Sequence, residues 1–249
     1  MSTIYILWLR QLKRYARSRA RIVGSLGQPI LFLVALGFGF GPIFQKAGQG
    51  NYIQFIAPGV IAMSILFTAV FSGIEIIWDR QFGFLKETMV APVSRFTIML
   101  GRTLGGATVA TLQGVIMFFI SLLVGFRPVL GPSLPLAFLA MFLVALLFTG
   151  LGTAIACRMR DMQAFPLIMN FVMMPLFFLS GALFPLAGLP SGLAVATKFN
   201  PMSYGVDAMR VTLTGAPAHF GLGMDFAVLA IGCALALVAG AWMFSKIEA

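Results

Sequence analysis

Residues 47–74, AGQGNYIQFIAPGVIAMSILFTAVFSGI, contain no charged residue. A helix needs about 20 apolar residues to cross a hydrocarbon core about 30 Å thick, and this stretch is long enough. Five further uncharged windows lie at 22–45, 103–126, 128–157, 162–197 and 226–245. We therefore predict a single-domain (1–249), all-α integral membrane protein with six transmembrane helices, near 24–43, 55–77, 102–125, 134–157, 163–182 and 226–245.

The composition supports this class. Of the 249 residues, 60% are hydrophobic and only 10% are charged, whereas soluble domains carry about 25% charged residues. A surface so poor in charge must face lipid. Cys157 and Cys233 lie in separate apolar windows, which predicts neither a disulfide framework nor a metal site.

The basic residues predict the orientation. With the N-terminus inside, thirteen of the seventeen Lys and Arg residues fall on the inner side. The outer side receives Lys46, Arg127, Lys198 and Arg210. Because cytoplasmic loops carry the excess of Lys and Arg, both termini are expected to be cytoplasmic, in a multi-pass protein of the cell membrane.

Residues 3–20 are predicted to form an amphipathic helix lying in the membrane surface. Its apolar side would carry Trp8, Leu9, Leu12, Tyr15 and Ala16. Its other side would carry Arg10, Lys13, Arg14 and Arg17. Such a pattern is typical of interfacial helices next to anionic lipid headgroups, and an elbow near 21–24 would lead into the first span.

The fifth window is too long for one straight span. Pro185 and Pro190 interrupt a helix in the stretch 181–190, because proline lacks the backbone donor. Short apolar pieces then flank Asn200-Pro201. We predict that residues 183–211 form a re-entrant helical hairpin in the outer leaflet; the alternative is an ordinary external loop.

The loop after the second span is the most distinctive cytoplasmic segment. Residues 84–91 can form two helical turns between Gly83 and Pro92. This short helix is either a docking element for a soluble partner or a solvated connection. Glu75, at the inner end of the span, is expected to pair with Arg80 or Arg102, or else to reach the membrane surface as a helix-end residue.

Catalytic and nucleotide-binding motifs are missing from the sequence. It contains no G-x-x-x-x-G-K-[ST], H-E-x-x-H or G-x-S-x-G pattern. The spans contain almost no ionisable residues, which disfavours a secondary transporter. Small residues recur four apart, as at Gly37/Gly41, Gly101/Gly105, Gly152/Ala156 and Gly232/Ala236/Gly240, and indicate close helix packing within one chain or between two.

Three blocks resemble the permease subunits of ABC-2 family (type V ABC) exporters, including drug-resistance and lipo-oligosaccharide export permeases. They are GFLKETMVAPVSR (83–95) with IMLGR (98–102), FLSGALFPLAGLP (178–190) and NPMSYGVDAMR (200–210). With the six spans and the interface helix, the likeness covers essentially the whole chain.

The resemblance implies a dimer of permease chains. Each chain would dock to a separate nucleotide-binding ATPase subunit, which would hold ATP and Mg. No cofactor is expected on this chain, which would not be an enzyme itself. The helix at 84–91 would be the coupling helix, contacting the ATPase through Phe84, Leu85, Lys86, Glu87, Thr88 and Met89. A second contact would use Arg158, Arg160 and Asp161. Apart from the resemblance, a Glu75 paired with Arg80 or Arg102 would tie the second span to the coupling segment and help transmit the motion of the ATPase.

The resemblance also implies an outer gate and a cargo path. The gate would contain Pro185, Pro190, Asn200, Pro201, Tyr204, Asp207 and Arg210. The path would be lined by spans two and five, facing the partner chain. The residue types of Phe67, Phe71, Phe171, Met174 and Phe177 suit such an apolar path, although plain helix packing accounts for them equally well. We expect an amphipathic or lipid-like cargo such as a drug or antibiotic. A lipid-linked saccharide exporter, or a stand-alone secondary transporter or channel, is the alternative.

Overall fold

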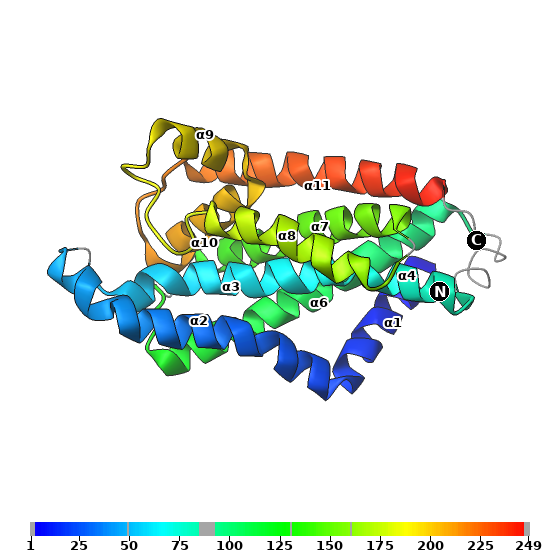
Figure 1. Ribbon diagram of the computed structural model, residues 1–249, viewed down its shortest axis with the longest axis horizontal. Helices are drawn as coiled ribbons and strands as arrows, with labels where there is room; N and C mark the ends of the chain where they lie inside the picture. Colours follow the sequence, from blue (N-terminus) through cyan, green and yellow to red (C-terminus); the bar gives the residue numbers. More distant parts are fainter. Residues whose placement is uncertain (1–2, 49, 85–92, 130, 160, 247–249) are drawn as a thin grey trace.

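The computed structural model describes residues 3–48, 50–84, 93–129, 131–159 and 161–246, and these residues form helices and loops without a strand (Figure 1). The helices are α1 (Thr3–Arg17), α2 (Arg19–Lys46), α3 (Tyr52–Phe71), α4 (Ile74–Gln81), α6 (Arg95–Val124), α7 (Leu134–Arg158), α8 (Ala164–Phe178), α9 (Ser191–Phe199), α10 (Pro201–Thr214) and α11 (Leu222–Ser245). The predicted all-helical class is confirmed for the described residues.

Among the described residues, five helical stretches are long and apolar enough to cross a membrane. They are α2, α3 continued by α4, α6, α7 and α11. The predicted fifth span corresponds to α8, whose 15 residues reach only about 22 Å. The helix ends before Gly181, which adopts a φ of 73°, and Pro185 follows. Six spans therefore remain a prediction.

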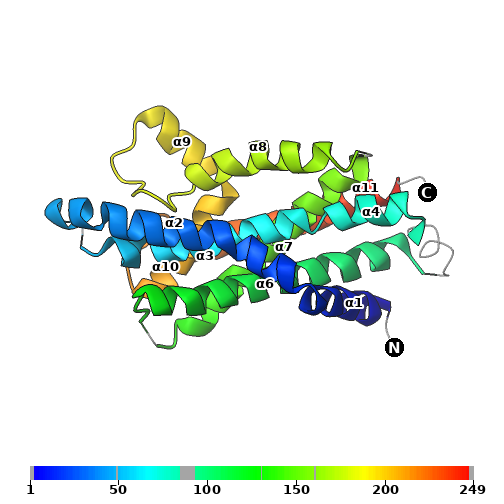
Figure 2. The same ribbon diagram turned by 60° about the horizontal axis from the view of Figure 1, so that its bottom comes forward.

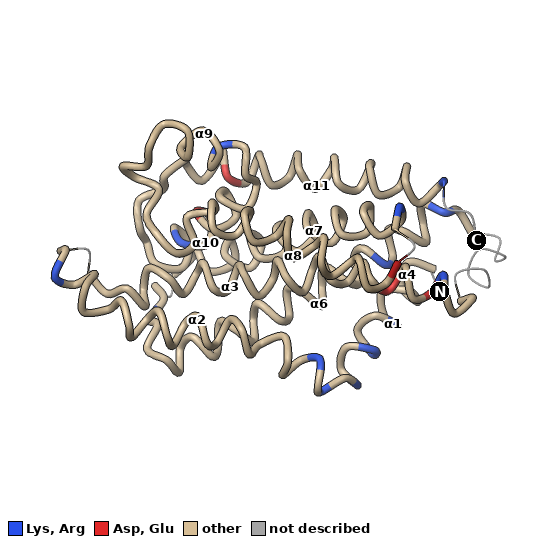
Figure 3. The backbone as a smooth tube through the Cα atoms, viewed as in Figure 1, with Lys and Arg blue, Asp and Glu red and all other residues tan. Residues whose placement is uncertain are grey.

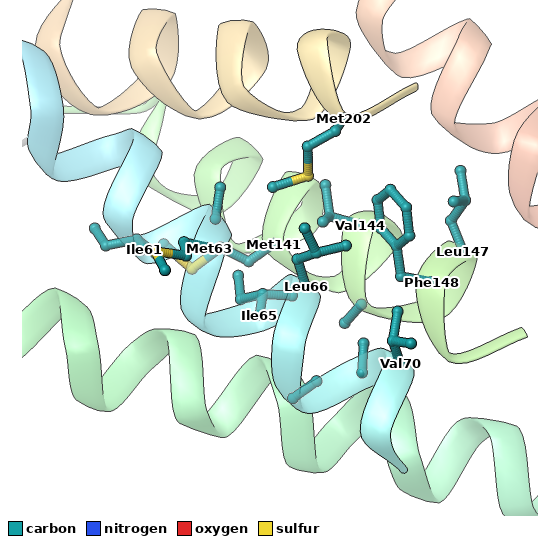
Figure 4. Close-up of a cluster of buried hydrophobic side chains, with 14 of the residues drawn as sticks. Ile61, Met63, Ile65, Leu66, Val70, Met141, Val144, Leu147, Phe148 and Met202 are labelled. Atoms are coloured by element: carbon teal, nitrogen blue, oxygen red, sulfur yellow. The ribbon is translucent and has the colours of Figure 1, made fainter. Parts of the chain in front are cut away.

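Helix α3 lies at the centre of the bundle. The rest of the chain buries 72% of an 18-residue apolar window within the stretch formed by α3 and α4. The corresponding share is only 22% for α2 and for α11. Figure 4 shows Ile61, Leu66 and Val70 of α3 meeting Val144 and Phe148 of α7. A helix that is apolar all round must be covered by other helices or by lipid, and α3 is covered mainly by other helices of the chain.

The small residues mostly serve packing within the chain. A Cβ at Gly152 of α7 would lie 2.5 Å from the Val70 carbonyl oxygen of α3, and one at Gly105 of α6 would lie 2.7 Å from Gln11 Cγ of α1. At Gly232 of α11 it would lie 2.6 Å from Leu147 Cδ1 of α7. Gly41 instead faces open space.

Helix α1 packs against α6 and ends earlier than predicted. The elbow lies at Ser18, where φ is −100° and ψ is 74°, not at 21–24. The Ser18 carbonyl accepts from Arg21 N and Ile22 N, so it already begins α2. The face covered by α6 carries Leu7, Trp8 and Tyr15, whereas Ala16, predicted on the apolar side, is exposed. Figure 2 shows α1 bent away from α2.

Two short helices flank Asn200-Pro201, as the sequence predicts. Helix α10 is largely buried, and α9 is mostly exposed. Asn200 caps α10, because its side chain accepts from Met202 N at 3.0 Å. The depth of this segment in a membrane stays a prediction.

Candidate functional site

A cluster of charges around two buried carboxylates joins four helices near the end of the bundle where α1 begins and α11 ends, called here the terminal end (Figures 1 and 3). We call the cluster the charge clamp; it comprises Glu75, Asp79, Arg10, Arg14, Arg21 and Arg102. The two carboxylates belong to α4, and the four guanidinium groups come from α1, α2 and α6.

The two carboxylates occupy one face of α4, because residues four apart lie one turn above each other. Glu75 accepts from Arg21 at 2.7 Å and lies 3.6 Å from Arg14. Asp79 accepts from Arg102 and lies 3.6 Å from Arg10. Both acids are almost fully buried, and burying a carboxylate is costly unless cations or hydrogen-bond donors pair with it.

The predicted partner of Glu75 is wrong. Arg102 pairs with Asp79, and Arg80 donates to the carbonyls of Cys157 at 2.9 Å and Met159 at 3.2 Å. Arg80 therefore satisfies orphan carbonyls at the C-terminus of α7. Glu75 faces the opposite way, toward the elbow between α1 and α2.

Four residues of the charge clamp, Asp79, Arg10, Arg14 and Arg21, were not predicted from the sequence to belong to a site. The spacing of the charged residues is the sequence signal that could have indicated them. Glu75 and Asp79 are four apart, and Arg10, Arg14, Arg17 and Arg21 recur every three or four residues. Such spacing predicts two charged helix faces, and only packing brings them together.

Neutral hydrogen bonds reinforce the same junction. Tyr15 of α1 donates to Gln113 of α6, and Gln113 Nε2 donates to Ser25 Oγ of α2 at 2.8 Å. Trp8 Nε1 donates to Thr108 Oγ1 at 3.0 Å. Burial raises the pKa of the Tyr15 phenol, which keeps it a neutral donor.

The predicted coupling residues lie at the terminal end or outside the described residues. Phe84 is half-exposed, and the Arg10 guanidinium lies 5.9 Å from the centre of its ring. Leu85, Lys86, Glu87, Thr88, Met89 and Arg160 fall outside the described residues. Arg158 is exposed at the end of α7, and Asp161 Oδ1 accepts from Gln163 N at 2.7 Å. Arg80 lies just before the predicted contact segment at 84–89 and bonds to Cys157 and Met159, next to the second predicted contact at 158–161. It therefore links the two predicted contact segments.

The predicted cargo-path residues do not share one cavity. A cavity of about 370 Å³ between α2 and α3 is lined by Phe67 and Phe71, with Arg21 and Gln28 as polar groups. On α8, Phe171 is 81% exposed, and Met174 is partly buried. Phe177 is fully buried, with its ring 6.3 Å from that of Phe32.

The predicted outer-gate residues gather at the far end of the bundle, around α9 and α10. Asn200 Nδ2 donates to Leu176 O at 2.7 Å, and Pro201 is the first residue of α10. The Tyr204 hydroxyl donates to Lys198 O at 2.8 Å. Pro185 is partly buried, and Pro190 precedes α9. The segment is thus held by hydrogen bonds to the end of α8.

Charged groups also tie this end together. Asp207 Oδ2 accepts from His219 N at 2.8 Å and Phe220 N at 2.9 Å. Arg210 donates to Gly181 O at 2.7 Å and lies 4.0 Å from the centre of the Phe55 ring. Asp225, in the first turn of α11, is fully buried, and neither of its carboxylate oxygens has a hydrogen-bond partner within the described chain. The sequence analysis overlooked it, because it lies just before the predicted last span.

Within the described ranges, no three or more His, Cys, Asp or Glu residues gather as a metal site would require. The ion pairs of the charge clamp fasten α4 electrostatically to α1, α2 and α6.

Comparison with known proteins yields a consistent set of relatives. A family model described as ABC-2 type transporter matches residues 2–214. Nodulation protein J of Rhizobium leguminosarum bv. trifolii is 30% identical over 215 residues, covering 86% of this chain and 79% of the relative. Putative transport permease ycf38 of Cyanophora paradoxa is 29% identical over 217 residues, covering 83% of this chain and 72% of the relative.

Proposed function

The chain belongs to the family of ABC-2 type transporters, and we propose that it is the permease subunit of an ATP-driven exporter. The matched region, residues 2–214, includes the whole charge clamp and α10. As a transport permease it would move cargo, while a separate nucleotide-binding subunit would bind ATP and Mg and hydrolyse the ATP.

The charge clamp is the observation that carries the proposal. Helix α4 ends directly before the predicted coupling segment at 84–91, and Ser72 and Gly73, which join it to α3, have helical φ and ψ. Its acids hold α1, α2 and α6, and Arg80 holds α7. A force applied by an ATPase after α4 would therefore reach five other helices at once.

The second permease chain would pack on the apolar faces that this chain leaves uncovered. Helix α3, predicted to face the partner, is largely covered by its own neighbours. Large apolar side chains are instead exposed on α2 and α8, among them Leu31, Phe38 and Phe171. We propose that α2 and α8 contribute most of the dimer surface, with lipid covering the rest.

The cargo would be amphipathic or lipid-like, such as a drug or antibiotic. The cavity beside α2 supports this class, because Phe67, Phe71 and Met63 offer apolar surface while Arg21 and Gln28 offer polar groups. Aromatic and methionine side chains accommodate varied apolar shapes.

We place the terminal end on the cytoplasmic side of a cell membrane. Basic residues gather at that end, where α1 begins and α11 ends (Figure 3). An excess of Lys and Arg marks the cytoplasmic side of membrane proteins.

The first experiment is a mild detergent purification of tagged chain from its native host, followed by mass spectrometry of the accompanying proteins. A nucleotide-binding subunit in equal amount supports the proposal. The variant Lys86→Ala/Glu87→Ala should lose most of that subunit, and the control Lys46→Ala/His219→Ala, at the far end, should keep it. A chain that purifies without any ATPase would overturn the exporter proposal in favour of a stand-alone transporter or channel.

A further inference from the structure

A groove separates α1 from α4 at the terminal end, beside the charge clamp. We call it the basic groove; its volume is about 720 Å³, within the range of roughly 300–1,000 Å³ of small-molecule sites. Helix α1 contributes Arg10, Lys13, Arg14 and Arg17 to the lining, and the α4 side contributes Asp79.

The charges in the basic groove are unbalanced. Arg10 and Arg14 each lie 3.6 Å from a carboxylate of the charge clamp, that of Asp79 and that of Glu75 respectively. These two acids already pair with Arg102 and Arg21. Lys13 and Arg17 lie within 4.0 Å of no carboxylate among the residues that the structure describes. An anion in the groove would relieve this repulsion and gain several charge-assisted hydrogen bonds.

The remaining lining is apolar and aromatic. Trp78 and Phe82 form the α4 wall, and Tyr5 and Ile6 lie opposite on α1. Phe82 is 70% exposed and Ile6 is 52% exposed, so this surface is open. The Arg14 guanidinium lies 5.5 Å from the centre of the Trp78 ring. Aromatic rings next to cations are typical of the headgroup level of a bilayer.

Two further hollows adjoin the basic groove. It shares Arg14 and Trp78 with a hollow of about 360 Å³, which in turn shares Arg21 and Phe71 with the cavity beside α2. The three neighbouring hollows lie in series between the cations of α1 and the apolar residues Met63 and Phe67. A ligand that fits has an anionic group at one end and an apolar chain at the other, which an acidic peptide lacks.

We propose that the basic groove binds the phosphate headgroup of an anionic phospholipid from the adjoining leaflet. The phosphate contacts Lys13, Arg14 and Arg17, and an acyl chain follows the hollows past Phe71. The lipid fastens α1 to α4 next to the charge clamp. This inference rests on the predicted position of α1 at the membrane surface. It does not depend on ATPase docking or on the identity of the cargo.

Native mass spectrometry of the detergent-purified chain, with whichever subunits accompany it, tests the proposal. Dioleoyl phosphatidylglycerol or dioleoyl phosphatidylcholine is titrated in, and retained lipid is counted per chain. We expect one phosphatidylglycerol to be retained at concentrations where phosphatidylcholine is not. Because each basic residue near an anionic lipid contributes about 1 kcal/mol, Lys13→Gln/Arg17→Gln should weaken retention about 30-fold.

The matched control is Arg19→Gln/Lys246→Gln, which removes the same charge at the terminal end from exposed residues outside the groove. It should retain phosphatidylglycerol like the wild type. Equal retention of the two lipids, or equal weakening in both double variants, overturns the proposal. An ATPase that stays bound throughout leaves the exporter proposal standing in either case.

Discussion

The carboxylate of Asp79 and the guanidinium of Arg102 are in direct contact inside the bundle, although the two residues are 23 positions apart in the sequence. Arg102 is 6% exposed and Asp79 is 5% exposed, so neither charge is well hydrated. The outer pairs of the clamp, from Arg10 and Arg14, involve side chains that are 42% and 37% exposed. Screening by solvent makes such exposed pairs weak, and the inner pair dominates the energetics of the clamp.

Replacing Asp79 should therefore destabilise the chain strongly. Asp79→Ala leaves Arg102 buried without its carboxylate, a change that costs about 3–5 kcal/mol. Thermal unfolding in detergent should show a much lower Tm. The control Asp161→Ala removes an exposed carboxylate with a single backbone hydrogen bond and should change Tm little. A similar Tm for both variants would contradict the importance of the inner pair.

The two acids at the far end should respond in opposite directions. Asp207→Ala leaves two backbone N–H groups, those of His219 and Phe220, without their acceptor, at about 1–3 kcal/mol each. Asp225→Asn replaces a buried, unpartnered carboxylate with a neutral group of the same shape, so it should raise Tm. If Asp225→Asn instead lowers Tm as much as Asp207→Ala, Asp225 has a partner beyond the described chain.

At the scale of elements, glycines set how closely the helices approach. Gly152 brings α7 against the backbone of α3, where a side chain would meet the Val70 carbonyl oxygen. A backbone group cannot rotate aside as a flexible side chain can. Gly39, on the open face of α2, has no such neighbour within the described residues.

The variants Gly152→Ala and Gly39→Ala make the same chemical change in these two settings. Gly152→Ala should lower stability by about 1–3 kcal/mol, because it forces α7 away from α3. Gly39→Ala should raise it by about 0.4–1 kcal/mol, because alanine loses less backbone freedom on folding. Tm measured in the same detergent distinguishes them. Destabilisation by Gly39→Ala would indicate that a partner chain packs closely on α2.

Arg80 connects two elements, α4 and the end of α7. Arg80→Met should reduce cargo-stimulated ATPase activity several-fold while the ATPase still co-purifies, since the variant removes the link rather than the predicted contact residues. Arg127→Met is the control, because Arg127 likewise donates to a helix-end carbonyl, that of Leu122, but at the far end. Equal losses in both variants would refute a specific role of Arg80 in coupling.

For the whole molecule, the proposed orientation places Arg19 and Lys46, the two ends of α2, on opposite sides of the membrane. A chain with Cys157 and Cys233 replaced by alanine can carry a single new cysteine at Arg19 or Lys46, both exposed. In intact cells a membrane-impermeant maleimide should label Lys46→Cys and leave Arg19→Cys unlabelled. The reverse pattern would invert the topology and move the predicted ATPase contacts to the wrong side.

Much of the architecture follows from local patterns in the sequence. Uncharged windows predicted the apolar helices α2, α3, α6, α7 and α11, because a segment without charge is stable only in an apolar environment. The proline and glycine positions after Phe178 predicted the interruption of the fifth window. The likeness to ABC-2 permeases, inferred from three short blocks, is confirmed by the match over residues 2–214.

The sequence by itself thus determined the class of the chain, its apolar helices and its family, since hydrophobicity and proline act through the nearest residues. Only the tertiary structure decided how the helices are rotated and paired. The rotation of α4 turns Glu75 toward Arg21 and Arg80 toward α7. Packing of α3 against several helices determines that rotation, so the contacts of the charge clamp depend on residues far from it in sequence.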